Sequence, residues 1–531
     1  MKTIVDLIAD LDNAPQSKVF VYDRRGQSNE ECSYAELCGR ARAVGAHYLE
    51  QGFEPGEYVF LQLTNSIELI EGFLGAIIVG LIPCCLASPR SLGGTKGFRE
   101  RMHSLARSFP DSRLIAHEDV GKMAGIPYST PLDVATIDLT QGDALAPLIL
   151  ADPNSLAFVQ LTSGSTHRPK AVRISHRALM SNAKNICAGL TRGADSVVSW
   201  LPLYHDMGLV GCLLCPLYLH IDIHLMQPET FLTRPEMWLR RISDIPGPSI
   251  SNAPNSAYQS CVQRIRDAEV EKLDLSRWRI AGSGAERVRA ETLAAFADHF
   301  APAGFRSDAF VPCYGLAETT LAVTYGYGGT VPNIDAGHVS CGRPISETEV
   351  EIRDAKGNVL AEGEAGEITV RSESLFSGYA GHDDHPSPIQ DGWLRTGDRG
   401  YLKDGELYVT GRYKDLIIVD GVNYDPDEFE FIGESTVEIN GARSGAFSLE
   451  LDGRERTVLV NEITPQSDDV YEELSRRVGT RMAELFGFRI YDVRFVRRGS
   501  LPKTSSGKVR RAKLRSLYEN DELETLWRQR S

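Results

Sequence analysis

Residues 161–176, with the sequence LTSGSTHRPKAVRISH, gather hydroxyl groups around a glycine and place a lysine shortly afterwards. Gly164 would let the backbone approach a ligand closely. Main-chain amides in such a turn can bind an anion, and Lys170 would add a charge suited to a phosphate. The hydroxyl groups belong to Thr162, Ser163, Ser165 and Thr166. The segment does not match the Walker A pattern, so it predicts either a cradle for a polyphosphate or an ordinary polar loop.

Six further segments carry residue types that could bind or react, and the first three follow predicted strands. In doubly wound sheets, ligands bind at the carboxyl ends of the strands, so these three are expected to share one site. The six segments are WLPLYHDMGL (200–209), GSGAE (282–286), YGLAETT (314–320), RTGDRGYL (395–402), GRYKDLI (411–417) and PKTSSGK (502–508). In the fourth of them we expect Asp398 to lie in a turn.

The elements that must position these residues alternate between helix and strand. Ser33 and Glu36 form a capping-box pattern at the start of a predicted helix that closes at Gly52. The other predicted strands are 58–63, 81–86, 196–201, 221–226 and 277–284, and the other predicted helices are 66–80, the segment after 205–209, and 285–300. Such a βαβ succession predicts an α/β fold with parallel sheets and helices on both faces.

Beyond about residue 337 the pattern changes to short strands with Gly and Asp turns, which predicts a β-rich subdomain over 337–411. The last section combines a hairpin around residues 452–453, a helix over 468–486 and a basic tail. We therefore expect a large N-terminal domain over 1–411 and a small mobile α+β domain over 417–531. Because the junction lacks the composition of a flexible linker, a short hinge over 412–416 is predicted.

Composition excludes several classes of protein. The net charge of −15 argues against a nucleic-acid binder, which needs a basic face. The ten cysteines show no disulfide spacing, and Cys212 and Cys215 lie in an apolar run that predicts core packing. The N-terminus does not resemble a secretory signal, and the apolar run 73–87 is too short to span a membrane, so it predicts a buried helix followed by a strand. A reducing, cytoplasmic location is expected.

Taken in this order, the segments resemble the adenylate-forming superfamily of acyl-CoA synthetases, peptide-synthetase adenylation domains and luciferase, over about residues 30–515. LPLYHDMGL, YGLAETTLAV, VSCGRP and KDLIIV together look most like the fatty acyl-AMP ligases. The resemblance implies that ATP and Mg²⁺ are used to activate a carboxylic acid, a fatty acid or a related one, to acyl-AMP with release of pyrophosphate. It further implies transfer to the phosphopantetheine thiol of a holo acyl carrier protein, in polyketide or lipid biosynthesis. The alternatives are an acyl-CoA ligase and a non-catalytic adenylate-binding protein.

Two residues receive catalytic roles from this resemblance. Lys508 is implied to bridge the substrate carboxylate and the α-phosphate, although by sequence alone it could be a solvated lysine in a basic tail. His205 matches the position that meets the substrate carboxylate, and its alternative is a core histidine. Relatives that activate amino acids carry an aspartate at that position, so an amino-acid substrate is not expected. Asp206 has no implied role and could cap the following helix.

The nucleotide site is implied by the same resemblance. Tyr314 would offer a flat face to adenine, Asp398 and Arg412 would bind the ribose, and Glu318 would be the Mg²⁺ ligand. The alternatives are core packing for Tyr314, a plain turn for Asp398 and a helix-start glutamate for Glu318. The full ATP-binding set is Thr162, Ser163, Gly164, Ser165, Thr166, Lys170, Ser283, Gly284, Ala285, Tyr314, Gly315, Thr319, Asp398 and Arg412.

The chain departs from the family pattern in places that bear on phosphate binding and on the acceptor. His167 and Ala171 replace glycines of the usual T-S-G-S-T-G-x-P-K-G. The insertion that fatty acyl-AMP ligases normally carry after YGLAETT is absent or very short. Against this, the segment after 415 lacks a lysine common in CoA ligases, and Asp420 and Asp425 would repel the phosphates of CoA.

Two expectations about the C-terminal domain follow. The acidic segment 419–430, with Asp427, Glu428 and Glu430, disfavours CoA, so a carrier protein is the expected acceptor. Arg510 and Arg511 in KVRRAKLR are expected to form a basic docking patch for that carrier. Asp415 is expected to be the hinge residue that absorbs the rotation between two domain poses.

Overall fold

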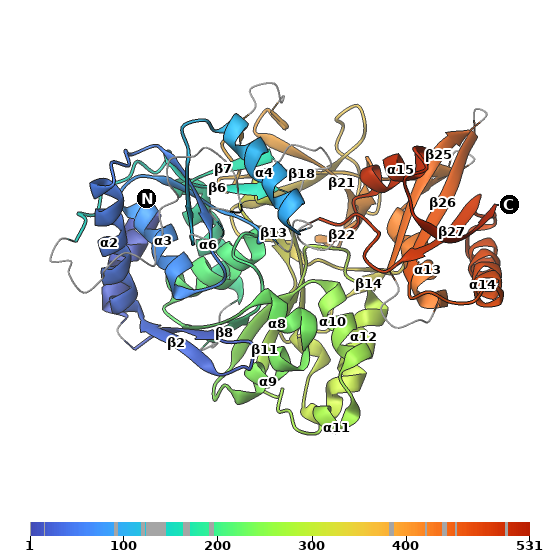
Figure 1. The fold of residues 1–531 in the computed structure, drawn as a ribbon, viewed down its shortest axis with the longest axis horizontal. Helices are drawn as coiled ribbons and strands as arrows, with labels where there is room; N and C mark the ends of the chain where they lie inside the picture. Colours follow the sequence, from blue (N-terminus) through green and yellow to red (C-terminus); the bar gives the residue numbers. More distant parts are fainter. Residues whose placement is uncertain are drawn as a thin grey trace.

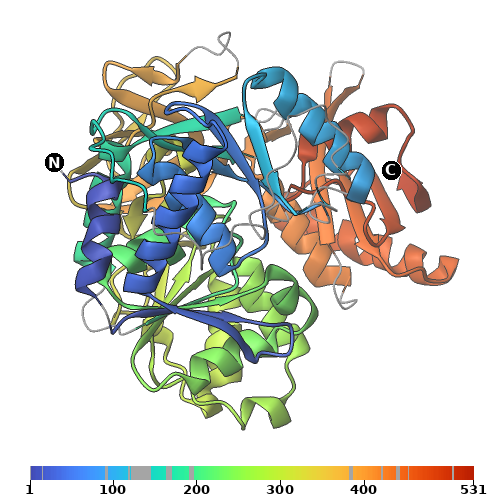
Figure 2. The same ribbon diagram turned by 60° about the vertical axis from the view of Figure 1, so that its left-hand side comes forward.

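The chain folds into a large part and a smaller part that lie side by side. Figures 1 and 2 show the smaller part, coloured deep orange to red, next to the remainder, which runs from blue through green and yellow to light orange. The apolar clusters of the described residues lie either before residue 410 or after residue 416, so each part has its own core. The domain limits themselves stay a prediction. The computed structural model describes residues 2–14, 16–89, 94–117, 120, 123, 145–162, 170–190, 196–381, 387–419, 422–437, 443–451, 454–504 and 508–530.

A nine-stranded sheet forms the centre of the large part. Six adjacent strands in its middle run parallel to one another, from β12 to β1 in the order given below. The strands added at the two edges are antiparallel. The strands in spatial order are β16 (Arg343–Pro344), β13 (Ala322–Tyr325), β12 (Phe310–Gly315), β11 (Trp278–Ser283), β10 (Ser249–Ala253), β8 (Ser196–Ser199), β9 (Asp222–Met226), β1 (Lys18–Tyr22) and β2 (Ser28–Ser33). The predicted α/β class is confirmed.

Helices connect most of these strands, as the sequence predicts, but one begins later than expected. Helix α12 starts at Ala290 rather than at Ala285. Ala285 has φ of 65°, in the left-handed region, which a helix cannot include. The helices are α6 (His176–Leu190), η4 (Met207–Leu214, a π-helix), α7 (Cys215–Leu219), α8 (Pro228–Thr233), α9 (Glu236–Asp244), α10 (Asn255–Arg264), α11 (Asp267–Val270) and α12 (Ala290–Phe300).

A second parallel sheet, in the order β4-β3-β5, lies near the N-terminus. Its elements and the helices around it are α1 (Ile4–Asp10), α2 (Tyr34–Glu50), β3 (Tyr58–Gln62), α3 (Ile67–Ile78), β4 (Ile82–Cys85), α4 (Gly94–Ser108) and β5 (Arg113–Ala116). The capping box at the start of α2 is confirmed, with the Ser33 amide donating to Glu36 Oε2 at 2.8 Å. The apolar run 73–87 forms the buried end of α3 and strand β4, as predicted.

The cysteines are free thiols, and nine of the ten are buried. Cys212 and Cys215 lie in the core of the large part, which confirms the packing interpretation of their spacing. Within the described ranges, no helix is both long enough and apolar enough to cross a membrane.

Two β-rich units accompany the parallel sheets. The five-stranded unit contains β17 (Thr348–Arg353), β18 (Gly366–Ser372), β20 (Ile389–Gln390), β21 (Trp393–Lys403) and β22 (Glu406–Arg412). The three-stranded unit joins β19 (Tyr379–Ala380) to β7 (Lys170–Ser175) and β6 (Leu156–Thr162). A short hairpin pairs β14 (Ile334–Asp335) with β15 (His338–Val339). The three-stranded unit brings Tyr379 beside Lys170.

The smaller part is an α+β unit built on the sheet β25-β26-β27-β28. The hairpin β25–β26 and helix α14 form where the sequence predicts them. The end of the expected basic tail forms strand β28. The elements are β23 (Ile417–Val419), β24 (Val422–Tyr424), α13 (Pro426–Val437), β25 (Arg443–Leu451), β26 (Arg454–Ile463), α14 (Asp468–Phe486), β27 (Asp492–Arg497), α15 (Arg511–Glu519) and β28 (Thr525–Arg530).

A buried carboxyl group lies between helices α2 and α3. Glu71 is 2% exposed, and its Oε1 atom lies 2.6 Å from Arg40 Nε. Burial raises the pKa of Glu71 from 4.5 to about 7, although the Arg40 charge opposes the rise. The native state therefore holds this proton up to a higher pH than the unfolded chain does.

This difference predicts how Glu71→Gln changes stability with pH. The wild-type native state loses stability relative to the glutamine variant as pH rises from about 4.5 to about 7, since only the wild type must ionise a buried group. The free-energy difference over this range is about 3 kcal/mol at 1.36 kcal/mol per pKa unit. Thermal unfolding midpoints of both proteins at pH 5, 6, 7 and 8 measure it. A midpoint difference that stays flat over this range contradicts the assignment.

Candidate active site

Asp398 lies within strand β21 and not in a turn, so that prediction is wrong. In the antiparallel pairing of β21 with β22, Asp398 stands opposite Arg412. The Arg412 Nε atom donates to Asp398 Oδ1 at 2.7 Å, and the Tyr314 hydroxyl donates to Oδ2 at 2.8 Å. The Asp398 side chain is 7% exposed, whereas that of Arg412 is 61% exposed. The structure thus brings three of the predicted nucleotide-site residues into one hydrogen-bonded group.

Tyr314 and Gly315 end strand β12, next to the end of β11. Burial, together with the Asp398 charge, raises the pKa of Tyr314 well above its ordinary value, so its hydroxyl stays a donor. A Cβ atom on Gly315 would lie 1.7 Å from the carbonyl oxygen of Leu321, so only glycine fits there.

The segment 283–285 follows strand β11, and its backbone is unusual. A Cβ atom on Gly284 would lie 2.5 Å from Cys313 Sγ, and Ala285 has a positive φ. Strained backbone of this kind is concentrated at ligand-binding sites. Ser283 is fully buried, and its Oγ atom has no hydrogen-bond partner among the described residues. Because β11 and β12 are parallel neighbours, their ends at 283 and 314 lie at the same edge of the sheet, as predicted.

The ends of the opening segment lie on a hairpin, with Thr162 opposite Lys170 in the pairing of β6 with β7. The Lys170 Nζ atom lies 4.6 Å from the centre of the Tyr379 ring. The Tyr379 hydroxyl in turn donates to Glu318 Oε1 at 2.8 Å. The expected phosphate-binding lysine and the expected metal ligand are thus linked through one tyrosine. Predicted residues that lie outside the described residues are Ser163, Gly164, Ser165, Thr166 and His167.

Tyr379 was not predicted from the sequence. It belongs to a two-residue strand, β19, that pairs with β7, and it stands opposite Val172. No local pattern in the sequence indicates so short a strand, so only its aromatic side chain could have drawn attention. Ala171, which replaces a family glycine, is fully buried and pairs with Ala380 in the same unit.

Thr319 is used inside its own turn. It ends the short 3-10 helix η7 (Ala317–Thr319), is 1% exposed, and donates its hydroxyl to the Leu316 carbonyl oxygen at 2.9 Å. Its place in the ATP-binding set stays a prediction. Glu318 precedes it and is the metal-ligand candidate. In the described part of the chain, no cluster of three or more His, Cys, Asp or Glu side chains could hold a metal ion.

His205 and Asp206 form a close pair before the π-helix η4. His205 Nδ1 lies 2.6 Å from Asp206 Oδ1, and the Met207 amide donates to the same oxygen at 2.7 Å. Asp206 thus caps the helix, as the sequence suggested. Burial alone would raise the pKa of Asp206, but these two contacts lower it overall. Hydrogen bonding of Nδ1 to this carboxylate would leave Nε2 of His205 as the ring nitrogen available to a ligand.

Lys508 lies within electrostatic range of Asp206 and of the Asp398–Arg412 pair. Desolvation by surrounding protein lowers its pKa most, and the Arg412 charge lowers it further. The side chain is nevertheless exposed to solvent, and water screens this lowering. The Lys508 amide donates to Thr504 Oγ1 at 3.1 Å. The carboxylates that raise its pKa belong to Glu286, Asp206 and Asp398.

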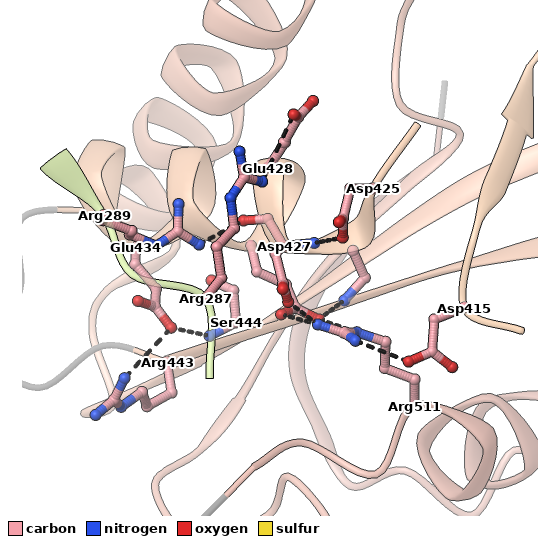
Figure 3. Close-up of polar contacts among 12 residues, drawn as sticks. Arg287, Arg289, Asp415, Asp425, Asp427, Glu428, Glu434, Arg443, Ser444 and Arg511 are labelled. Atoms are coloured by element: carbon pink, nitrogen blue, oxygen red, sulfur yellow. Dashed lines mark hydrogen bonds and ion pairs between the residues drawn. The ribbon is translucent and has the colours of Figure 1, made fainter. Parts of the chain in front are cut away.

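The acidic segment 419–430 does not form the exposed acidic surface that was expected. Asp425 and Glu430 are each 8% exposed, and Asp427 contacts Arg511 (Figure 3). Arg511 is 18% exposed and committed to ion pairs, so it cannot contribute to a docking patch. Both predictions are therefore corrected for these residues, because the acidic and basic segments neutralise each other inside the protein. Asp420 lies outside the described residues.

Known proteins resemble the chain over almost its whole length. Residues 9–380 match the family described as AMP-binding enzyme. A protein of Caulobacter vibrioides with the provisional name of acyl-CoA synthetase is 32% identical over 544 residues, covering 95% of this chain and 93% of that protein. The medium-chain-fatty-acid–[acyl-carrier-protein] ligase JamA of Moorena producens is 30% identical over 572 residues, covering 97% and 94%.

A solved structure from a study of fatty acyl-adenylate ligases of E. coli and L. pneumophila has the same fold. It superposes with a TM-score of 0.88 at 33% identity, and the match covers 98% of both chains. The likeness therefore extends over both parts of the molecule.

Proposed function

Since the chain belongs to the family of AMP-binding enzymes, which activate acids as acyl adenylates, we propose that it activates a fatty acid and passes the acyl group to the thiol of a carrier protein. The resemblance to adenylate-forming enzymes is confirmed. The observation that carries the proposed mechanism is the position of Lys508, within electrostatic range of Asp206 and Asp398. JamA, a carrier-protein ligase, supports the choice of acceptor.

In the proposed first step, a carboxylate oxygen of the acid bonds to the α-phosphorus of ATP. The bond from that phosphorus to the oxygen shared with the β-phosphate breaks, and pyrophosphate leaves with both electrons of that bond. Two anions must approach each other, so preorganised cations and donors lower the barrier. Lys508 supplies the charge between them, and His205 Nε2 faces the acid.

The nucleotide is held by residues at strand ends and on the paired strands β21 and β22. Asp398 has two oxygens for the ribose hydroxyls, with Arg412 beside it and Tyr314 against the base. The backbone of 284–285 lies against the base, and the absent side chain of Gly284 lets this backbone pack against Cys313. Lys170 is positioned for the outer phosphates.

Glu318 fits the role of Mg²⁺ ligand. Its Oε1 atom accepts from Tyr379, and no described residue hydrogen-bonds to Oε2, which leaves an oxygen for a cation. A single carboxylate suits Mg²⁺, which takes its other ligands from phosphates and water. When bound, the ion neutralises phosphate charge. Tyr379 holds the carboxylate through this hydrogen bond, and Lys170 lies over the Tyr379 ring.

An acyl-CoA ligase is the second candidate, and one observation favours it. The buried and paired carboxylates of segment 425–430 no longer present a charge barrier to the phosphates of CoA. The Caulobacter vibrioides relative, with its provisional acyl-CoA synthetase name, agrees with this alternative.

A panel of acids tests the proposed function. We expect pyrophosphate release with straight-chain fatty acids and none with amino acids, because His205 replaces the aspartate that would pair with an α-ammonium group. Thioester formation is then compared at equal concentrations of CoA and holo carrier protein. Faster transfer to the carrier supports the proposal, and faster transfer to CoA selects the second candidate. No acid-dependent pyrophosphate release with any acid would refute both.

A further inference from the structure

Arg511 begins helix α15, close behind Lys508 in the chain, and contacts three carboxylates (Figure 3). Its Nε and Nη2 atoms donate to the two oxygens of Glu430, each at 2.7 Å. Its Nη1 atom lies 3.1 Å from Asp415 Oδ2, and Nη2 also contacts Asp427. One guanidinium group therefore joins the start of α15 to α13 and to the segment after β22.

The charges of this cluster depend on Arg511. Burial raises the pKa of Glu430 to about 7, although the Arg511 contact opposes the rise. Burial would also raise the pKa of Asp427, but Arg511, with Arg289 and Arg287, holds it at about 2. Without the guanidinium group, three carboxylates would face one another in a poorly solvated place. A lysine would keep the charge but not the parallel pair of hydrogen bonds to Glu430.

Two arginines of the large part also contact helix α13. The Arg289 Nη2 atom donates to the Asp427 carbonyl oxygen at 2.7 Å, and Arg287 Nη1 lies 3.6 Å from Glu428 Oε1. Both arginines follow the segment 283–285 closely in the chain. Figure 3 shows Asp427 between Arg289 and Arg511. The start of α13 is thus held from the nucleotide side and from the Lys508 side.

Asp415 extends this connection to the ribose pair. It lies just after Arg412, which bonds to Asp398, and the Asp415 amide donates to the Arg412 carbonyl oxygen at 3.2 Å. A guanidinium contact at Asp415 therefore fixes the short chain between Arg412 and β23 relative to α15. That chain is the predicted hinge.

We propose that Arg511 is a positioning residue for acyl-AMP formation, which fixes the start of α15, and with it Lys508, relative to the segment 412–415 and α13. Lys508 then stays in range of Asp398 and Asp206 while the acid attacks. The inference rests on the proposed function of Lys508, and it replaces the expected carrier-docking role of Arg511.

The test compares Arg511→Gln and Arg511→Lys with a matched control on the same helix. Arg515 pairs with Glu519 at 2.9 Å on the exposed face, so Arg515→Gln removes an ion pair without touching the cluster. For Arg511→Gln we expect kcat of acid-dependent pyrophosphate release to fall about tenfold to 100-fold, since small misplacements of a reacting group have effects of this size. KM for the acid should stay within about twofold, and Arg511→Lys should recover part of the loss. Arg515→Gln should stay near wild type.

A second measurement separates positioning from a general loss of structure. Transfer from supplied acyl-AMP to the acceptor should survive in Arg511→Gln, because that step does not use Lys508. Equal losses in both half-reactions, or a wild-type kcat in Arg511→Gln, would overturn the inference. If Arg511→Gln does not fold, Asp415→Asn gives the answer, because it removes the charge from one of the three contacts and leaves those to Glu430 and Asp427. A wild-type kcat in Asp415→Asn would then overturn the inference.

Lys508→Ala, assayed in parallel, separates a failure of the proposed role of Lys508 from a failure of the positioning role of Arg511. If Lys508→Ala releases pyrophosphate normally, the role of Lys508 fails, and the reason given for Arg511 fails with it. If Lys508→Ala is inactive while the Arg511 variants are normal, only the positioning role is wrong.

Discussion

Replacing Lys508 by alanine is expected to lower the rate of acyl-AMP formation by about 100-fold to 1,000-fold, the usual effect of removing one preorganised charge stabiliser. The acid and the α-phosphate are both anionic, and Lys508 is the proposed cation for them, within electrostatic range of Asp206 and Asp398. Acid-dependent pyrophosphate release at saturating ATP measures the effect. The fold should persist, because the Lys508 side chain is exposed to solvent.

Two controls accompany this variant. Lys513→Ala removes another lysine from the same basic run and should leave the rate near wild type. Transfer of the acyl group from supplied acyl-AMP should survive in Lys508→Ala, because no anion is then joined to phosphate. Normal pyrophosphate release by Lys508→Ala would show that this lysine is only part of a solvated tail.

Asp398→Ala is expected to raise KM for ATP by about 100-fold. The variant loses up to two hydrogen bonds from ribose hydroxyls to a carboxylate, at about 1.5 kcal/mol or more each. It also releases Arg412 and the Tyr314 hydroxyl from their shared partner. Initial rates over a wide range of ATP concentrations, at saturating acid, give KM and kcat separately. We expect most of the loss in KM, since the ribose is bound alike in the ground state and the transition state.

The chain offers a matched control for this variant. Asp335 also accepts from a tyrosine and a cation, with Tyr401 Oη at 2.8 Å and Lys403 Nζ at 2.6 Å, but none of these residues belongs to the candidate site. Asp335→Ala should therefore show a similar structural cost with an unchanged KM for ATP. Equal KM values in the two variants would argue against ribose binding by Asp398.

The parallel sheets could be predicted from the sequence because helix and strand patterns alternate strongly and carry clear end signals. The Ser33–Glu36 capping box and the helix over 468–486 lie where expected. The late start of α12 could not be predicted, because a positive φ at an alanine is a tertiary effect without a local signal. The strand position of Asp398 could not be predicted either, because the neighbouring Gly397 and Gly400 are typical of a turn although they belong to a long strand.

The candidate site was predictable as a set of strand ends, but its cross-chain contacts were not. Tyr379 enters the site through a strand of two residues, and no periodicity can reveal so short an element. The acidic and basic segments near Asp427 and Arg511 were interpreted as two separate surfaces. Charge along a sequence does not show whether opposite segments fold against each other, and here they do.

The burial of the native thiols makes the chain a suitable starting point for fluorescence experiments. Nine of the ten cysteines are buried, and burial raises the pKa of the remaining one, Cys313, to about 12, which keeps it protonated and poorly reactive toward maleimides. Dyes would then attach selectively to cysteines introduced at exposed positions, such as Glu291 on α12 and Glu472 on α14. Energy transfer between two such dyes would follow, in single molecules and in real time, how far the two parts of the enzyme separate during a catalytic cycle.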